Sequence, residues 1–323
     1  GSRVTKPMVR QGGKLVETNW ESAFAAIRNG MERIKEEHPD DSILVSASPK
    51  LTEEELYLAG RLGRGSLGTN NLVSFQMLTN EADYHALDEM LGKTAATIGS
   101  KELQEADLYL FIGGNPTKEN PVMGWQMKRR MRHGTEAVVI NSSAIDLTRY
   151  ATVWADARRG TATQLLNAVA SEILRQGKSD KEFVAEHTEN SSQVFRELLK
   201  FDIEEACSVA GVNVEQVRRI ADLLTDPEKK VVAWYNLDSR IDRSGGDLQA
   251  LATLMLLTGK MRDGSGLALT TGQCNHFGMR LAGFGDRLLP GSTTATDEYM
   301  LSLVGSLWKS DLKKMIGENP AGI

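Results

Sequence analysis

Cysteine and histidine are scarce in this chain of 323 residues, and their scarcity limits the disulfides and metal sites that it can form. Its two cysteines, Cys207 and Cys274, exclude a disulfide framework and any cluster or zinc site that takes four thiolates from this chain alone. Five histidines are spread between His38 and His276, without an HxxxH or HExxH pair. We therefore expect no metal held by protein ligands unless distant residues converge, and a structural role for each histidine.

Long apolar runs and clustered positive charge are also missing. No run approaches the roughly 18 to 20 residues that cross a bilayer, and the start of the chain lacks the order of a signal peptide. The net charge is -5 and the basic residues are scattered, so nucleic acid is not an expected partner. We expect a soluble, cytoplasmic protein without direct membrane insertion.

What the sequence does contain is an alternation of strand and helix patterns. With 41% hydrophobic residues the chain can bury a core, and its length predicts two domains. Asn19, Thr52 with Glu55, and Asn213 stand where helix caps are expected. The alternation predicts an α/β fold with a parallel, doubly wound sheet, followed after Gly259 by a long glycine-rich functional loop. The predicted strands cover residues 42–48, 106–114, 137–142 and 229–238, and the clearest helices 19–34, 52–65, 122–134, 161–177, 214–224 and 247–259.

The stretch "LYLFIGGNPTKENP" is the first candidate site. Gly113 and Gly114 follow an apolar strand, and Asn115 and Pro116 come next. Glycines let the backbone approach a ligand, and the next helix offers free N–H groups to an anion. From spacing alone, a structural turn and a phosphate cradle are equally good interpretations, because this is neither the GxGxxG fingerprint nor a P-loop.

Two further segments invite the same pair of interpretations. Thr271, Gln273, Asn275 and His276 alternate with glycines in "TTGQCNHFG", where they either wrap a polar ligand or cross between domains. Residues 141–143 end another predicted strand with polar side chains. The three acidic residues of a later segment match no EF-hand loop and are interpreted as solvated caps and turns; they are Asp238, Asp242 and Asp247.

Taken in order, these segments resemble the molybdopterin oxidoreductase family. The resemblance is to the central region shared by formate dehydrogenase catalytic subunits and the large iron-sulfur subunit of NADH-quinone oxidoreductase, which is complex I. It rests on an ordered series that covers nearly the whole sequence: "RVTKPMVRQGGKLVETNWESAFAAI", "TEEELYLAGRLGRGSLGTNNL", "ELQEADLYLFIGGNPTKENPVM", "GTATQLLNAV" and "LATLMLLTGKMRDGSGLALTTGQCNHFG".

The resemblance implies a molybdopterin guanine dinucleotide held between two α/β lobes. Iron-sulfur clusters are expected only outside this chain, which looks like the central piece of a longer protein, and other subunits of a redox complex are the expected partners. The cofactor-binding residues that it implies are Gly113, Gly114, Asn115, Pro116, Pro121, Asn141, Ser142, Gly160, Thr161, Gly272, Gln273, Asn275 and Gly278.

Departures from the family pattern concern the catalytic positions. Thr79 and Asn80 stand where the resemblance places a metal-bound Cys or selenocysteine and its neighbouring His, and Thr271 stands where it places an arginine. A threonine hydroxyl is a poor ligand for a soft, redox-active metal. Gly160-Thr161-Ala162 replaces Gly-Thr-Asp and loses a carboxylate, and residues 141–143 replace Asp-Pro-Arg.

The sequence therefore predicts two Rossmann-like lobes with mainly parallel sheets, residues 1–82 with 271–323 and an inserted lobe, 83–270. The leading function is a structural region of an electron-transfer subunit in an NADH-quinone oxidoreductase-like complex, cytoplasmic and peripheral to the membrane through partners. Enzyme activity of the isolated chain is not expected. Two alternatives stay open: a fragment of an active molybdenum or tungsten enzyme of the formate dehydrogenase class, and a guanine-dinucleotide-binding module without a redox role.

Overall fold

The computed structural model describes residues 3–38, 43–74, 77–92, 95–237, 245–285 and 287–318. The chain separates into two compact units, Gly1–Ser74 with Asn275–Ile323 and Phe75–Cys274. The domain boundaries predicted from sequence, after residues 82 and 270, stay a prediction. Among the described helices, none combines the length and the apolar character that a membrane crossing requires.

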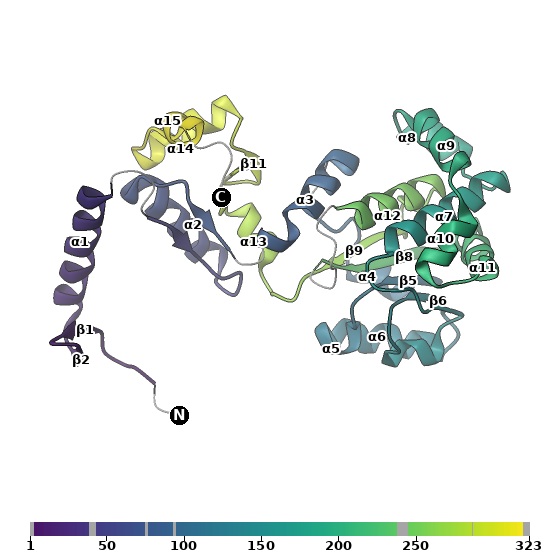
Figure 1. The fold of residues 1–323 in the computed structure, drawn as a ribbon, viewed down its shortest axis with the longest axis horizontal. Helices are drawn as coiled ribbons and strands as arrows, with labels where there is room; N and C mark the ends of the chain where they lie inside the picture. Colours follow the sequence, from purple (N-terminus) through teal and green to yellow (C-terminus); the bar gives the residue numbers. More distant parts are fainter. Residues whose placement is uncertain are drawn as a thin grey trace. The chain divides into compact units, whose positions relative to one another are not determined.

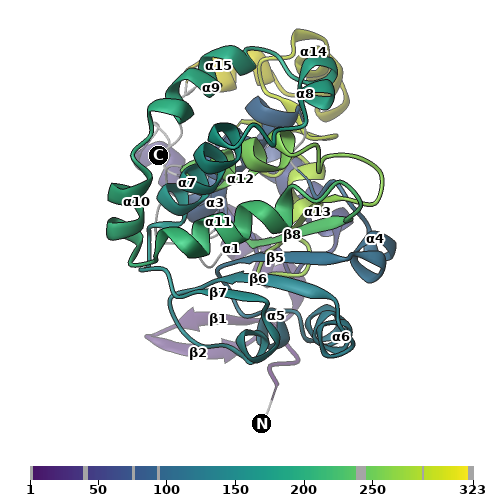
Figure 2. The ribbon, with the colours of Figure 1, turned by 90° about the vertical axis from the view of Figure 1, so that its right-hand side faces the viewer.

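The unit Phe75–Cys274 is built on a five-stranded sheet in which every pairing is parallel (Figures 1 and 2). The strand order is β7-β6-β5-β8-β9. These strands are β5 (Leu108–Ile112), β6 (Glu136–Ile140), β7 (Val153–Ala155), β8 (Val231–Asn236) and β9 (Gly266–Thr270). The α/β fold class predicted from sequence is confirmed.

Helices cover both faces of this sheet, because its strands are apolar on both sides. Tyr109, Phe111 and Trp234 pack on one face with Met127 and Met131 of α6, and Figure 1 shows α7 and α12 beyond the other face. The helices of the unit are α3 (Met77–Leu91), α4 (Ser100–Glu105), α5 (Pro116–Glu119), α6 (Pro121–Arg132), α7 (Ala162–Arg175), α8 (Lys181–His187), α9 (Ser191–Lys200), α10 (Ile203–Ala210), α11 (Val214–Leu224) and α12 (Gly246–Leu257), with a 3-10 turn, η2 (Asp146–Tyr150).

The other unit combines helices with short strand pairs. Strand β3 pairs with β4 in parallel, whereas β1 with β2 and β10 with β11 form antiparallel hairpins. Fully buried Arg64 donates hydrogen bonds to Asn70, Gly283 and Gly285, and so joins the two chain segments of the unit. The elements are β1 (Met8–Gln11), β2 (Lys14–Glu17), α1 (Trp20–Glu37), β3 (Val45–Ser46), α2 (Glu53–Arg61), η1 (Leu62–Leu67), β4 (Leu72–Val73), α13 (His276–Leu281), β10 (Leu288–Leu289), β11 (Thr293–Thr294), α14 (Glu298–Trp308) and α15 (Leu312–Glu318).

The helix caps expected from sequence are confirmed. Asn19 accepts from the amide of Ser22 at 2.8 Å, and Thr52 and Glu55 form the reciprocal capping box. Asn213 caps α11 in the same way. Each cap satisfies N–H groups that the first turn of a helix leaves without partners.

The prediction of one long loop after Gly259 is wrong. Residues Gly266–Thr270 form β9, the edge strand of the sheet, and His276–Leu281 form α13. Leu267 and Leu269 are buried in the sheet. The flanking glycines hid this short apolar strand, because glycine is usually depleted from strands.

Candidate functional site

The strand order creates a switch point between β5 and β8. From β5 the chain proceeds outward to β6 and β7, whereas β8 and β9 extend the sheet on the other side of β5. In open parallel sheets a ligand binds outside the carboxyl ends of the strands at such a point, because the loops diverge there. The turn at Gly113 lies at this edge, directly after β5.

Two consecutive glycines turn the chain from β5 into α5. Gly113 and Gly114 have φ values of 63° and 69°, in the left-handed region that glycine adopts without strain. The amide of Gly113 donates to the carbonyl of Ile140 at 2.9 Å and so extends the pairing of β5 with β6. Asn115 then precedes α5, and Pro116 begins it. This geometry is a specific turn out of the sheet edge.

Gly114 is enclosed on several sides. The side-chain amide of Asn141, at the end of β6, donates to the carbonyl of Gly114 at 2.7 Å. A Cβ at position 114 would lie 2.9 Å from Oε2 of Glu119 and 3.1 Å from Cβ of Asn236. The amide of Asn236 in turn donates to that Glu119 oxygen at 2.5 Å. Three strand ends and α5 therefore fix the position of the turn.

A pocket of about 100 Å³ lies beside this turn and has room for several water-sized groups. It collects residues from the ends of β5 and β6 and from the segment before α7. The lining residues are Ile112, Gly113, Gly114, Ile140, Asn141, Ser142, Ala157, Arg158, Arg159, Gly160, Ala162, Tyr235 and Asp247. The structure thus brings together five of the residues predicted for cofactor binding: Gly113, Gly114, Asn141, Ser142 and Gly160.

Asp247 is a site residue that the sequence analysis misjudged. Its expected role as a solvated cap is wrong, because the residue is only 7% exposed and lines the pocket. Its Oδ1 accepts from the amide of Thr163 at 2.9 Å and from the hydroxyl of Thr163 at 2.5 Å. Its place in the first turn of the mostly apolar helix α12 is the signal for burial. Asp238 and Asp242 lie outside the described residues.

The other predicted residues have different surroundings. Pro121 is the first residue of α6, and Thr161 precedes α7 and donates to the carbonyl of Arg158 at 2.6 Å. Gly272 and Gln273 follow β9 in the loop that leaves the sheet. These four residues do not line the pocket at Gly114.

Asn275 and Gly278 belong to the other compact unit. There Asn275 is hydrogen-bonded to its own unit, since its main-chain amide donates to the carbonyl of Pro49 and its side-chain amide to that of Leu51. A Cβ at Gly278 would overlap with the side chain of Asn275. The side chains of Thr79 and Asn80 lie outside the described part of α3.

Comparison with known proteins decides the family. The family model for molybdopterin oxidoreductase matches residues 3–316, which is nearly the whole chain. The chain belongs to the molybdopterin oxidoreductase family. Membership implies a molybdopterin-type cofactor, and it agrees with the family resemblance found in the sequence.

Relatives of this chain include formate dehydrogenase-like proteins. It is 26% identical over 317 residues to the probable oxidoreductase YjgC of Bacillus subtilis (strain 168), covering 98% of this chain and 32% of the relative. It is 25% identical over 316 residues to the F420-dependent formate dehydrogenase subunit alpha of Methanocaldococcus jannaschii, covering 98% and 46%. The chain therefore spans less than half the length of these relatives.

Among solved structures, acetylene hydratase from Pelobacter acetylenicus has the same fold. The TM-score is 0.67 at 18% sequence identity, over 80% of this chain and 36% of that chain. At this identity the likeness concerns the fold alone.

The sheet edge fits a molybdopterin-type cofactor in its pattern of hydrogen-bonding groups. Among the described residues, the buried side-chain oxygens without a hydrogen-bond partner include three that end or follow strands at this edge: Oε1 of Gln164 in the first turn of α7, Oγ1 of Thr270 at the end of β9, and Oε1 of Gln273. Unsatisfied buried acceptors suit a ligand that presents N–H groups, as pterin and guanine rings do. In the part of the chain that the structure describes, no three His, Cys, Asp or Glu side chains group as metal ligands.

Proposed function

We propose that this chain is a non-catalytic region of an electron-transfer subunit, in which the cofactor fold serves as scaffold. Thr271 carries the proposal, because it stands where the family resemblance places an arginine. Its hydroxyl donates to the carbonyl of Gln273 at 2.7 Å and accepts from the amide of Gln273 at 3.4 Å, and the residue is 8% exposed. A neutral side chain bonded into its own loop supports a structural role, whereas an arginine presents a permanent cation to a reacting anion.

The composition of the other catalytic positions supports the same proposal. The family resemblance places a thiolate or selenolate at Thr79 and a histidine at Asn80. A threonine hydroxyl stays protonated at neutral pH and does not provide the soft anionic ligand that such a metal prefers. An assembly of the NADH-quinone oxidoreductase kind is the proposed context, with electron transfer through iron-sulfur clusters outside this chain. The proposed location is the cytoplasmic face of the membrane, through partner subunits.

A second candidate is retention of the guanine dinucleotide without redox chemistry. The pocket at Gly114 favours it, together with the unsatisfied oxygens at the carboxyl ends of the strands. Gly113, Gly114, Asn141 and Ser142 would hold the polar part of such a cofactor. When bound, a molybdopterin cofactor supplies the redox-active metal, and the protein supplies binding and orientation.

The names of the relatives favour a third candidate, an active enzyme of the formate dehydrogenase class. Such an enzyme needs a metal ligand and a proton carrier in place of those lost at Thr79 and Asn80. This candidate predicts molybdenum or tungsten and formate oxidation in the intact protein, whereas the first predicts neither.

The deciding experiment uses the full-length natural protein, purified with its partner subunits. We expect no molybdenum or tungsten by elemental analysis, no formate oxidation, and co-purification with iron-sulfur subunits. Pterin fluorescence without metal would favour the second candidate. Bound molybdenum or tungsten together with formate oxidation would refute the scaffold proposal.

A matched pair of variants tests whether any pterin sits at the sheet edge. Ser142 and Ser143 are both exposed, but only Ser142 lines the pocket. Ser142→Trp should fill the pocket and remove the pterin, and Ser143→Trp should retain it. Equal pterin content in the two variants would place the cofactor elsewhere.

A further inference from the structure

A second pocket lies at the opposite, amino edge of the same sheet. Lys229 and Lys230 precede β8 and Ser265 precedes β9, and all three line a pocket of about 270 Å³. Because β8 has six residues at roughly 3.3 Å each, this pocket is about 20 Å from the turn at Gly114. It is therefore separate from the candidate cofactor edge.

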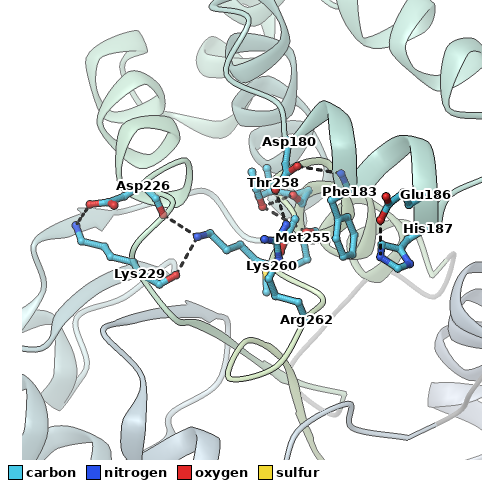
Figure 3. A network of polar contacts seen from close by, with 12 residues as sticks. Asp180, Phe183, Glu186, His187, Asp226, Lys229, Met255, Thr258, Lys260 and Arg262 are labelled. Atoms are coloured by element: carbon cyan, nitrogen blue, oxygen red, sulfur yellow. Dashed lines mark hydrogen bonds and ion pairs between the residues drawn. The ribbon is translucent and has the colours of Figure 1, made fainter.

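Lys260 places a buried cation in this pocket (Figure 3). The residue is 5% exposed, and its ammonium donates to the carbonyls of Asp226 at 2.7 Å and Lys229 at 2.9 Å. An ammonium has three N–H groups, so one donor remains. Burial, followed by the nearby cation of Arg262, lowers the pKa of Lys260. In the described part of the chain, no carboxylate forms an ion pair with Lys260.

Ser265 brings a second unused donor to the pocket. It is 6% exposed, and its oxygen accepts from the amide of Val231 at 2.9 Å. Its own hydroxyl proton has no acceptor among the residues that the structure describes. A buried donor without an acceptor is costly, so a ligand that accepts from it gains that free energy.

The remaining charges of the pocket are mostly matched. The other four cations each form an ion pair: Lys178 with Asp222, Lys229 with Glu136 and Asp226, Lys230 with Glu105, and Arg262 with Asp180. Three carboxylates also line the pocket, those of Asp180, Glu228 and Asp263, and the last two are exposed at its rim. Lys260 is therefore the cation of this pocket with which an added anion would form an ion pair.

We propose that this amino-edge pocket binds a tetrahedral oxyanion of the size of phosphate or sulfate. One oxygen accepts from the third N–H of Lys260 and another from the hydroxyl of Ser265. A charge-assisted hydrogen bond to a desolvated ammonium is stronger than a neutral one, so Lys260 contributes most of the affinity. The proposal is independent of the cofactor edge and of the scaffold function.

The test titrates the 323-residue chain with sodium phosphate and with sodium sulfate at neutral pH, using sodium chloride at equal ionic strength as the reference. Calorimetry gives the Kd, and nuclear magnetic resonance follows the amide of Val231. We expect a Kd below about 10 mM for both oxyanions, weakened about tenfold or more in Lys260→Met and about fivefold in Ser265→Ala. Lys200→Met, at an exposed lysine on α9, should stay within about twofold of the wild type.

Three results would overturn the proposal. They are an effect of chloride equal to that of the oxyanions, unchanged binding in Lys260→Met, and weakening by Lys200→Met as large as by Lys260→Met. If circular dichroism shows Lys260→Met to be unfolded, the oxyanion affinity of Ser265→Ala tests the site instead. Unchanged affinity in that variant, with no oxyanion-dependent shift of the Val231 amide in the wild type, would then refute the site.

Discussion

The contact between Asp247 and Thr163 provides the sharpest test of the pocket at the carboxyl edge. Asp247→Ala removes an acceptor that takes two hydrogen bonds, at 2.9 Å and 2.5 Å, in a residue that is 7% exposed. Hydrogen bonds to a charged group contribute about 1.5 to 3 kcal/mol each. Removing the buried charge offsets part of that loss. We expect the free energy of unfolding to fall by about 2 to 3 kcal/mol.

Urea unfolding followed by circular dichroism measures this loss, and hydrogen exchange of the α7 amides locates it. A double-mutant cycle with Thr163→Ala isolates the pairwise term, which should be about 1 kcal/mol or more. Asp247→Asn is the matched control, because it keeps an acceptor and removes the charge. It should lower the free energy of unfolding by about half as much as Asp247→Ala. A fall below about 0.5 kcal/mol for Asp247→Ala, or no coupling with Thr163, would show that the contact does not hold α7 at the pocket.

Four further substitutions test other contacts of the structure. Gly114→Ala should lower the free energy of unfolding by about 2 kcal/mol, because φ is 69° and a Cβ would lie 2.9 Å from a carboxylate oxygen of Glu119. An unchanged midpoint of urea unfolding would contradict the described turn. Gly124→Ala should lower the free energy of unfolding by about 3 kcal/mol or more, because its Cβ would overlap with a main-chain carbonyl of α5. Gly30→Ala in α1 has open space around it and should raise the free energy of unfolding by about 0.5 to 1 kcal/mol. Similar effects at the two sites would refute this contrast. Asp180→Asn keeps the helix cap and removes the ion pair with Arg262, at a cost of about 1 kcal/mol at neutral pH.

The pH dependence of Asp180→Asn follows from the direction of the pKa shift. Burial works to raise the pKa of Asp180, but the amide of Phe183 and the guanidinium of Arg262 together lower it below the ordinary value of 3.8. A lowered pKa gives stability that is fully present above 3.8 and is lost as pH falls through the folded value. The difference between wild type and variant should therefore be constant above about pH 4 and shrink at more acid pH, as measured by urea unfolding. A difference that grows on acidification would contradict the ion pair.

Much of the fold was predictable because local patterns and tertiary packing agree. The apolar strand before Gly113 and the cap at Asn19 both appear where the sequence places them. Strand β9 was missed, since its pairing with β8 depends on residues about 30 positions earlier that no local pattern reveals. Asp247 was misjudged for the same reason: its partner Thr163 lies 84 positions away. The glycine turn was visible in sequence, whereas the pocket needs three strand ends that only the sheet brings together.

The order of the strands has a consequence for how the chain is made. Strand β5 lies in the middle of the sheet, yet its neighbour β8 comes from residues more than 100 positions later, with β5 pairing Leu108 to Val231. During synthesis, one edge of "LYLFI" therefore stays unpaired until β8 has left the ribosome. Such an apolar, strand-forming edge invites association with other chains. A nascent chain that pauses before residue 231 would expose this unpaired edge of β5. A chaperone that binds the chain during this interval would prevent such association.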